Sequence, residues 1–261
     1  MKKLLIDKSI LITGSNRGIG KSLVERAAAN GANIWANARK RTDEFESFCE
    51  NIAKENNTKV MPIYFDLKNK NEILDAIKSI KKSELDINGL INNAGITYNS
   101  LFQMSTEDNI RENLDINFIG PFLLTQYVVK LMTRVGGGSI VSISSSAAMD
   151  ANSGRAAYGA SKAALQCSTK SLSREVGEIN IRANTVAPGI TKTDMISSMT
   201  DEVIELTAQS TSLKRCGNPD EIAISNVAKI ISKKFNNNEQ FEYLELPVDD
   251  PCRRKPLIDL A

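Results

Sequence analysis

Short apolar runs and longer helical stretches alternate along the whole chain. The apolar runs that we expect to form strands are residues 9–13, 33–37, 60–65, 89–92, 140–143, 181–186 and 241–246. The stretches between them that we expect to form helices are 21–30, 42–57, 69–82, 107–135, 158–177 and 218–233. Strands that alternate with helices are typical of a parallel sheet covered on both faces. The pattern predicts a single α/β domain over residues 1–261, with a doubly wound parallel sheet of about seven strands.

One proline interrupts the longest helical stretch. Pro121 has no N–H, so the carbonyl four residues earlier, that of Asn117, loses its intrahelical donor. We predict a kink at this place that leaves the Asn117 carbonyl free to hold a water molecule. A kink with only a packing role is the alternative.

Composition excludes several classes of function. The 261 residues include no histidine, which removes His-based triads and nearly all zinc-hydrolase schemes, and we expect no metal site. A formal net charge of +2 gives no electrostatic case for nucleic acid or an acidic membrane surface. No run approaches the ~18 apolar residues of a membrane span. The first residues are too polar for a signal peptide and the four cysteines form no C-x-x-C pair, so we expect a cytoplasmic protein with reduced thiols.

A glycine-rich loop joins the first strand to the first helix. Gly14, Gly18 and Gly20 follow the G-x-x-x-G-x-G spacing. Glycines let the backbone approach an anion, and the free N–H groups at a helix N-terminus bind it. We therefore interpret this loop as the cradle of a dinucleotide phosphate, with a glycine-rich turn that binds nothing as the alternative.

The end of the second strand indicates which dinucleotide is bound. NAD-binding units place an acidic residue there to bind the ribose hydroxyls, whereas this chain has Ala38 followed by Arg39. Arg39, together with Arg17 from the glycine loop, is suited to pair with a 2′-phosphate. Either arginine alone would be ordinary surface charge. Together, and with the acid missing, they favour NADP(H).

Polar residues and turns follow the other strands where they end. Asp66 is placed to contact an adenine amino group or, alternatively, to cap the helix at 69–82. Asn92 and Asn93 follow the fourth strand, where they are turn residues or tie neighbouring strands together beside the cofactor. A Pro-Gly turn at 188–189 belongs at the ligand rim of such a sheet, and we expect residues 190–213 to form a mobile substrate lid.

The chemistry centres on Tyr158 and Lys162. Four residues apart on a helix, their side chains share one face. An ammonium beside a phenol favours the phenolate, so we expect Lys162 to lower the pKa of Tyr158 toward the working pH. Such a hydroxyl gives or takes a proton at a carbonyl or alcohol oxygen. Ser145, at the end of the fifth strand, is placed to meet the same oxygen.

These motifs occur in one order and at consistent spacing, and together they resemble the short-chain dehydrogenase/reductase family. They are the glycine loop at 13–20, Asn92-Asn-Ala-Gly95, Asn117, Ser145, Tyr158-x-x-x-Lys162 and Pro188-Gly189. The resemblance covers residues from about 8 to 232 and is greatest to the 3-oxoacyl-acyl-carrier-protein-reductase-like group. It implies a Rossmann-like fold and an NADP(H)-dependent oxidoreductase that acts on a ketone or a secondary alcohol.

The resemblance also implies roles for individual residues. Tyr158 would be the acid/base, Ser145 would bind the substrate oxygen, Lys162 would hold the nicotinamide ribose, and the Asn117 carbonyl would anchor a water that relays protons to Lys162. The implied cofactor-binding residues are Gly14, Ser15, Asn16, Arg17, Gly18, Ile19, Gly20, Arg39, Asp66, Leu67, Asn93, Ala94, Gly95, Tyr158, Lys162, Pro188, Gly189, Ile190, Thr191 and Thr193. Asn92 is also expected to lie by the adenosine. The substrate pocket is expected to involve Ser145, Tyr158, Tyr98, Leu101, Met149, Asn152, Arg155 and Met195.

Two features depart from the family pattern. The tail at 236–261 lacks the usual glycine-rich close, which puts in doubt the family's C-terminal subunit contact. Arg155 beside the active tyrosine hints at an anionic or sugar-like substrate, with a solvated loop charge as the alternative.

The sequence leaves two other functional interpretations open. A cofactor-binding regulatory or scaffold protein without catalysis is one, and a sugar epimerase or dehydratase, which shares Tyr-x-x-x-Lys, is another. The epimerases and dehydratases usually have a different glycine spacing and a longer C-terminal domain. Family resemblance implies a homodimer or homotetramer, formed through the helices at 107–135 and 158–177.

Overall fold

The computed structural model describes residues 3–83, 85–150, 152–197, 199–223 and 243–245. Its strands are β1 Ser9–Ile12, β2 Asn33–Ala38, β3 Val60–Tyr64, β4 Gly89–Asn92, β5 Gly138–Ile143, β6 Ile181–Ala187 and β7 Tyr243–Glu245. Its α-helices are α1 Gly18–Ala29, α2 Asp43–Asn56, α3 Lys70–Lys82, α4 Glu107–Leu114, α5 Gly120–Arg134, α6 Ala147–Asp150, α7 Ala156–Val176, α8 Asp201–Ser210 and α9 Pro219–Ile222.

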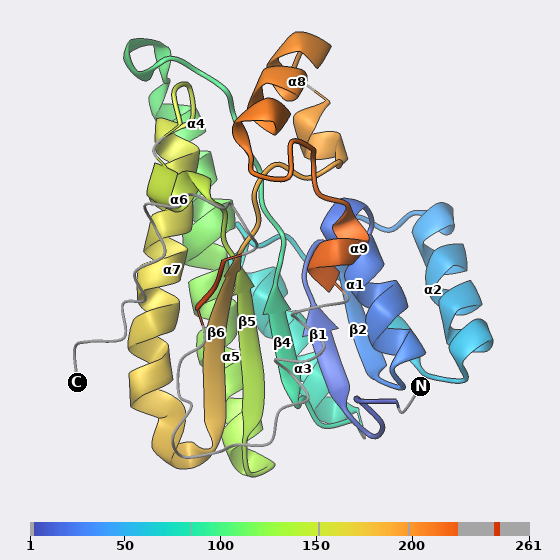
Figure 1. Cartoon of the computed structure of the whole chain (residues 1–261). Helices are drawn as coiled ribbons and strands as arrows, with labels where there is room; N and C mark the ends of the chain where they lie inside the picture. The colour runs from blue at the N-terminus through green and yellow to red at the C-terminus, as the bar shows by residue number, and fades with distance from the viewer. Residues whose placement is uncertain (1–2, 84, 151, 198, 224–242, 246–261) are drawn as a thin grey trace.

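The strands form one parallel sheet in the order β3-β2-β1-β4-β5-β6-β7 (Figure 1). The chain builds β1, β2 and β3 outward in one direction, then crosses back to place β4 beside β1. This reversal between β1 and β4 opens a crevice at the carboxyl ends of the strands. The predicted doubly wound, Rossmann-like α/β sheet is confirmed.

Residues of each strand alternate between two apolar clusters, one on each face of the sheet. In β1, Ile10 and Ile12 pack in the cluster that includes residues of α1, α2 and α9. Leu11, between them, packs in the cluster with residues of α3, α5 and α7. The sheet is therefore buried on both faces, as the continuous apolar strands require.

Local sequence fixes where several helices begin. The Thr42 side chain accepts a hydrogen bond from the Phe45 N–H at the start of α2. The Asn69 side chain accepts from the N–H groups of Asn71 and Glu72 at the start of α3. Short polar side chains satisfy the free N–H groups of a helix in this way. Asn69, and not Asp66, therefore caps α3.

The predicted interruption of the stretch at 107–135 is confirmed, but its form differs from a simple kink. Residues Asp115–Ile119 form a turn of π-helix between α4 and α5, with the Gly120 N–H donating to the Asp115 carbonyl. A π-turn places one extra residue in the helix, which shifts the helical faces on either side of it. The stretch is therefore two α-helices joined by a π-turn.

Other expectations have a more limited outcome. Strand β7 lies within the apolar run at 241–246 and pairs with β6, while the rest of the tail at 236–261 and the far end of the helix at 218–233 lie outside the described residues. Among the helices that the structure describes, none is long and apolar enough to cross a membrane.

Candidate active site

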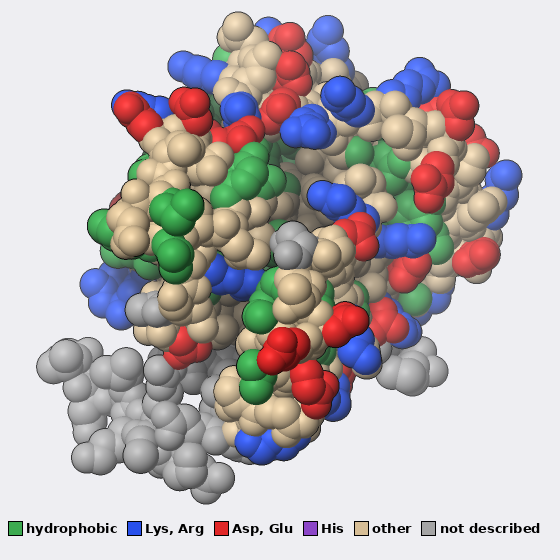
Figure 2. Space-filling model, turned by 90° about the horizontal axis from the view of Figure 1, so that it is seen from above, with side chains coloured by type: hydrophobic (Ala, Val, Ile, Leu, Met, Phe, Trp, Pro, Cys, Tyr) green, Lys and Arg blue, Asp and Glu red, His purple; other side chains and the backbone are tan. Residues whose placement is uncertain are grey.

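A cavity of about 640 Å³ lies at the carboxyl ends of the strands, where the strand order reverses. Figure 2 looks onto this end of the molecule, where several Lys and Arg side chains lie around a hollow near the centre. The glycine loop, the ends of β2 to β6 and the segment leading into α8 contribute its lining. The motifs singled out above, far apart in the sequence, therefore meet at one site.

The glycine loop forms the wall beside α1. Gly14 and Gly18 have φ values of +67° and +53°, which non-glycine residues rarely adopt. A Cβ on Gly20 would lie 1.9 Å from the Gly14 carbonyl oxygen, so only glycine fits there. The loop is tied from the opposite side by Asn93, whose Nδ2 donates to the carbonyls of Thr13 and Gly14. This tight backbone turn before a helix N-terminus fits a dinucleotide pyrophosphate.

One expected member of this loop does not reach the cavity. The Ser15 side chain is fully buried, and its hydroxyl donates to the Ile12 carbonyl at 2.8 Å. Ser15 thus closes the turn from below and does not line the cavity, so its assignment as a cofactor contact is corrected. The other loop residues, Gly14 and 16–20, do line it.

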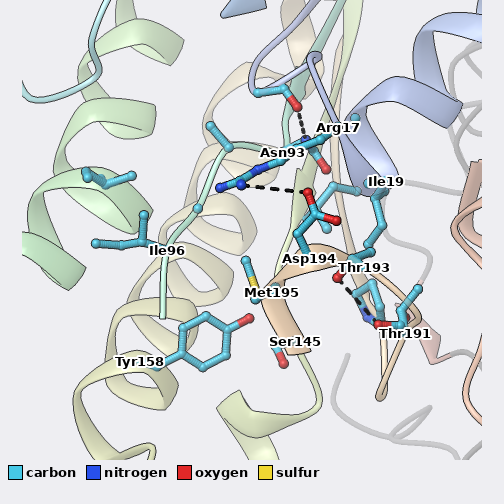
Figure 3. A pocket seen from close by; sticks show the side chains of 18 of the residues that line it. Arg17, Ile19, Asn93, Ile96, Ser145, Tyr158, Thr191, Thr193, Asp194 and Met195 are labelled. Atoms are coloured by element: carbon cyan, nitrogen blue, oxygen red, sulfur yellow. Dashed lines mark hydrogen bonds and ion pairs between the residues drawn. The ribbon is translucent and has the colours of Figure 1, made fainter. Parts of the chain in front are cut away.

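The cavity beyond the end of β2 carries the positive charge expected there. Arg39 and Arg17 both line it, and so does Lys40, which the sequence analysis missed. Asp66 and Leu67, at the end of β3, lie on the same rim. The Arg17 guanidinium lies 3.7 Å from the Asp194 carboxylate on the opposite side of the cavity, and both side chains are largely exposed (Figure 3). Basic residues thus surround the position expected for a ribose phosphate.

The two asparagines after β4 have different positions. Asn93, Ala94 and Gly95 line the cavity as expected. Asn92 is buried and turns away, with its Nδ2 donating to the Thr125 hydroxyl of α5 at 2.9 Å. Alternation along a strand sends neighbouring side chains to opposite faces, so the expectation that Asn92 lies by the adenosine is wrong.

Asn117 has a positioning role that the sequence did not reveal. Its fully buried side chain accepts from the Ile96 N–H and donates to the Ile96 carbonyl, each at 2.9 Å. It also donates to the Ser161 hydroxyl of α7 at 2.9 Å. The π-turn therefore places one amide where it joins the loop after β4 to the helix that carries Tyr158. The role of its carbonyl in holding a water remains a prediction.

Ser145, Tyr158 and Lys162 converge on the wall of the cavity formed by β5 and α7. Tyr158 is buried, and its side chain lies beside that of Ser145 (Figure 3). Lys162 is buried too, its Nζ donates to the Ile143 carbonyl at 2.8 Å, and it lies 6.0 Å from the centre of the Tyr158 ring. The spacing of four on α7 does place the phenol and the amine on one face.

The electrostatics of this group differ from the expectation. Burial raises the pKa of Tyr158, while the hydrogen bond with Ser145 and the charge of Arg155 act to lower it. Burial also lowers the pKa of Lys162 to about 8. At this pKa Lys162 is still largely charged at pH 7, but it is not among the groups that lower the pKa of Tyr158, and the burial of Tyr158 outweighs those that do. The prediction that Lys162 lowers the pKa of Tyr158 is therefore wrong.

The substrate side of the cavity matches the expected set in part. Asn152, Arg155 and Met195 line it, together with Ile196 and Met199, which the sequence analysis missed. Residues 188–191 and Thr193 also line it, and α8 stands above this opening (Figure 1). The segment at 190–213 is thus placed over the site, as a lid would be.

Three residues of the expected pocket lie elsewhere. Met149 on α6 is not among the residues that line the cavity, and its role as a substrate contact remains a prediction. Neither Tyr98 nor Leu101 lines it: Tyr98 instead donates its hydroxyl to the Glu112 carboxylate of α4, and Leu101 is about half exposed. A short α6 and a loop that runs outward after β4 carry these side chains away from the cavity.

The model of the family described as short chain dehydrogenase matches residues 8–203 of the chain. A 3alpha-hydroxysteroid dehydrogenase of Mediterraneibacter gnavus is 32% identical over 225 residues, which cover 85% of this chain and 89% of that protein. A 3-oxoacyl-acyl-carrier-protein reductase of Aquifex aeolicus is 33% identical over 223 residues, covering 85% and 90%. The structure of a proposed gluconate dehydrogenase of Agrobacterium tumefaciens superposes with a TM-score of 0.83 at 25% identity, covering 88% and 91%.

Proposed function

Because the chain belongs to the short-chain dehydrogenase family, we propose that it is an NADP(H)-dependent oxidoreductase that interconverts a ketone and a secondary alcohol. The observation that carries the proposal is the cavity itself. Its glycine loop and basic rim fit an NADP(H) pyrophosphate and 2′-phosphate, and its far wall presents Ser145, Tyr158 and Lys162. A proton donor thus lies in the same cavity as a dinucleotide cradle.

The cofactor would be held by contacts along the whole cavity. Gly14 to Gly20 would receive the pyrophosphate, and Arg17, Arg39 and Lys40 would pair with the 2′-phosphate. An acidic residue at the end of β2 would repel that phosphate, and Ala38 stands there instead. The nicotinamide, when bound, supplies or accepts the hydride.

The chain's own residues supply the proton and hold the oxygen. Tyr158 is protonated at neutral pH, since the ordinary pKa of a tyrosine is near 10 and burial raises it further, so it suits the donation of a proton to a carbonyl oxygen. Ser145, whose hydroxyl acts on the Tyr158 pKa from the same wall of the cavity, is placed to bind the same oxygen. Lys162 is anchored on the Ile143 carbonyl and would hold the nicotinamide ribose. Asn117 keeps α7 in register with the loop after β4.

A catalytically silent binding protein is the second candidate, because cofactor binding alone needs only the loop and the basic rim. The intact Ser145, Tyr158 and Lys162 group favours catalysis.

The proposal includes a homodimer or homotetramer through α4, α5 and α7, and Ile119 and Phe122 on that side are each more than 40% exposed in the single chain. Sedimentation that shows a monomer at micromolar concentration would contradict the oligomer.

The test of the function is the oxidation of NADPH, with NADH in parallel, over a panel of ketones. The panel holds 3-oxoacyl thioesters, keto sugars, keto acids and 3-oxosteroids, since the relatives' names span these types. We expect oxidation of NADPH well above NADH with at least one type. Tight binding of NADPH with no oxidation by any ketone would favour the binding protein, and a preference for NADH would refute the cofactor assignment.

A further inference from the structure

Arg155 is a charged side chain on the substrate side of the cavity, and the described residues give it no ionic partner. Arg155 stands directly before α7 and is half-buried in the lining, on the substrate side. Its guanidinium carbon lies 6.0 Å from the centre of the Tyr158 ring. Among the residues that the structure describes, no carboxylate lies within ion-pairing distance of it. A buried or half-buried cation is normally paired, so this position calls for an anion.

The present partner of Arg155 is a weak one. Its Nη2 donates to the Met199 sulfur at 3.1 Å, and a thioether is a poor acceptor. Asp66 and Asp194 are the two carboxylates among the described lining residues, and Asp194 faces Arg17. A carboxylate that enters the cavity would therefore replace a weak acceptor with a charge-assisted, two-pronged contact and would displace nothing of comparable strength.

The helix behind Arg155 adds to this preference. The 21-residue helix α7 has no acidic residue in its first turn. The positive end of its dipole and the guanidinium lie together, which is unfavourable without a nearby anion. Three neighbours on this side, Met195, Ile196 and Met199, are apolar, and Asn152 and Ser153 are polar but uncharged. They suit a short hydrocarbon linker and not a further charge.

We propose that the substrate carries a carboxylate a few bonds from its reacting carbonyl, and that Arg155 binds this carboxylate and so selects oxo acids over neutral ketones. The inference rests on the proposed function, since it names the substrate class of the same site. A single guanidinium among uncharged neighbours balances one negative charge. A carboxylate fits this balance, whereas a phosphate would bring a second charge with no partner.

The test compares each acid with its own methyl ester. Acetoacetate and levulinate are assayed with NADPH against methyl acetoacetate and methyl levulinate, for wild type, Arg155→Met, Arg155→Lys and the exposed control Arg134→Met. We expect wild type and the control to prefer the acids. Arg155→Met should lower the acid-to-ester ratio of kcat/KM roughly 10- to 100-fold, the value of a lost hydrogen bond to a charged group. Arg155→Lys should retain part of the preference, because an ammonium keeps the positive charge but cannot make the bidentate contact of a guanidinium.

The ratio separates recognition from general damage. A change in Tyr158 or in folding alters the rates with acid and ester alike and leaves their ratio unchanged. An equal loss with both substrates, or a wild type that prefers the ester, would overturn the inference and leave the proposed function standing. Weakened binding of NADPH by Arg155→Met would also overturn it, because the guanidinium would then serve the cofactor.

If no probe ketone is reduced, a binding measurement tests the inference instead. Calorimetry with NADPH present compares levulinate with methyl levulinate on wild type and Arg155→Met. Binding of the acid that the Arg155→Met change abolishes would support the inference while the oxidoreductase function fails. Absence of any preference for the acid would refute it.

Discussion

Replacement of Lys162 by methionine provides a quantitative test of the site's electrostatics. Lys162 is only 3% exposed, and burial lowers its pKa from 10.5 to about 8. A folded-state pKa below the unfolded one means that the folded protein binds fewer protons. The resulting cost to stability is full below pH 8 and disappears as the pH rises above 10.5. At about 1.36 kcal/mol for each pKa unit, the cost at neutral pH is about 3 kcal/mol.

The assay is urea unfolding of wild type and Lys162→Met at pH 7 and at pH 10. The methionine variant has no such cost, so its stability relative to wild type should be higher at pH 7 than at pH 10 by about 2 kcal/mol. The lost hydrogen bond to the Ile143 carbonyl affects both pH values and cancels in the comparison. A difference between the two proteins that does not change with pH would refute the reasoning, because Lys162 would then keep its ordinary pKa in the folded state.

Three further substitutions test other parts of the site. Arg39→Gln should weaken NADPH binding roughly 10- to 100-fold and leave NADH binding unchanged. The control is Arg41→Gln, which should change the binding of neither cofactor because Arg41 pairs with Glu46 outside the cavity. Equal effects of Arg39→Gln on both cofactors would contradict the 2′-phosphate contact. Gly20→Ala should abolish NADPH binding because its Cβ meets the Gly14 carbonyl, while Gly136→Ala, with open space around it, should cost only about 1–2 kcal/mol of backbone strain. Asn117→Ala should destabilise the fold by about 2–4 kcal/mol in urea, because it leaves buried backbone groups without partners; a loss below about 0.5 kcal/mol would show that the amide is not needed.

The sequence predicts this fold well because its information is local. Apolar runs of strand length, the helical stretches between them and the interruption before Pro121 each depend on neighbouring residues. Once strands and helices alternate, few sheet orders are physically reasonable. The form of the interruption at 115–119 is less predictable. Whether a proline produces a kink or a π-turn depends on what the helix packs against, and that is decided by distant parts of the chain.

Local sequence information also identifies part of the candidate site. Short motifs identify Tyr158, Lys162 and the glycine loop, because each motif carries its own geometry. The burial of Tyr158 and of Lys162, and with it the direction in which each pKa shifts, depends on how β5 and α7 pack and cannot be read from a spacing of four. The same holds for Ser15, whose neighbours Gly14 and Asn16 line the cavity while it does not.

The central claim is that Tyr158 transfers the proton in a reduction that uses NADPH. The most direct measurement is turnover together with NADPH affinity for Tyr158→Phe, with the best ketone of the panel. We expect turnover to fall by a factor of about 10²–10⁴ while NADPH affinity stays at the wild-type value, because only the hydroxyl is removed. Turnover that survives the loss of this hydroxyl would contradict the mechanism, whatever cofactor the protein binds.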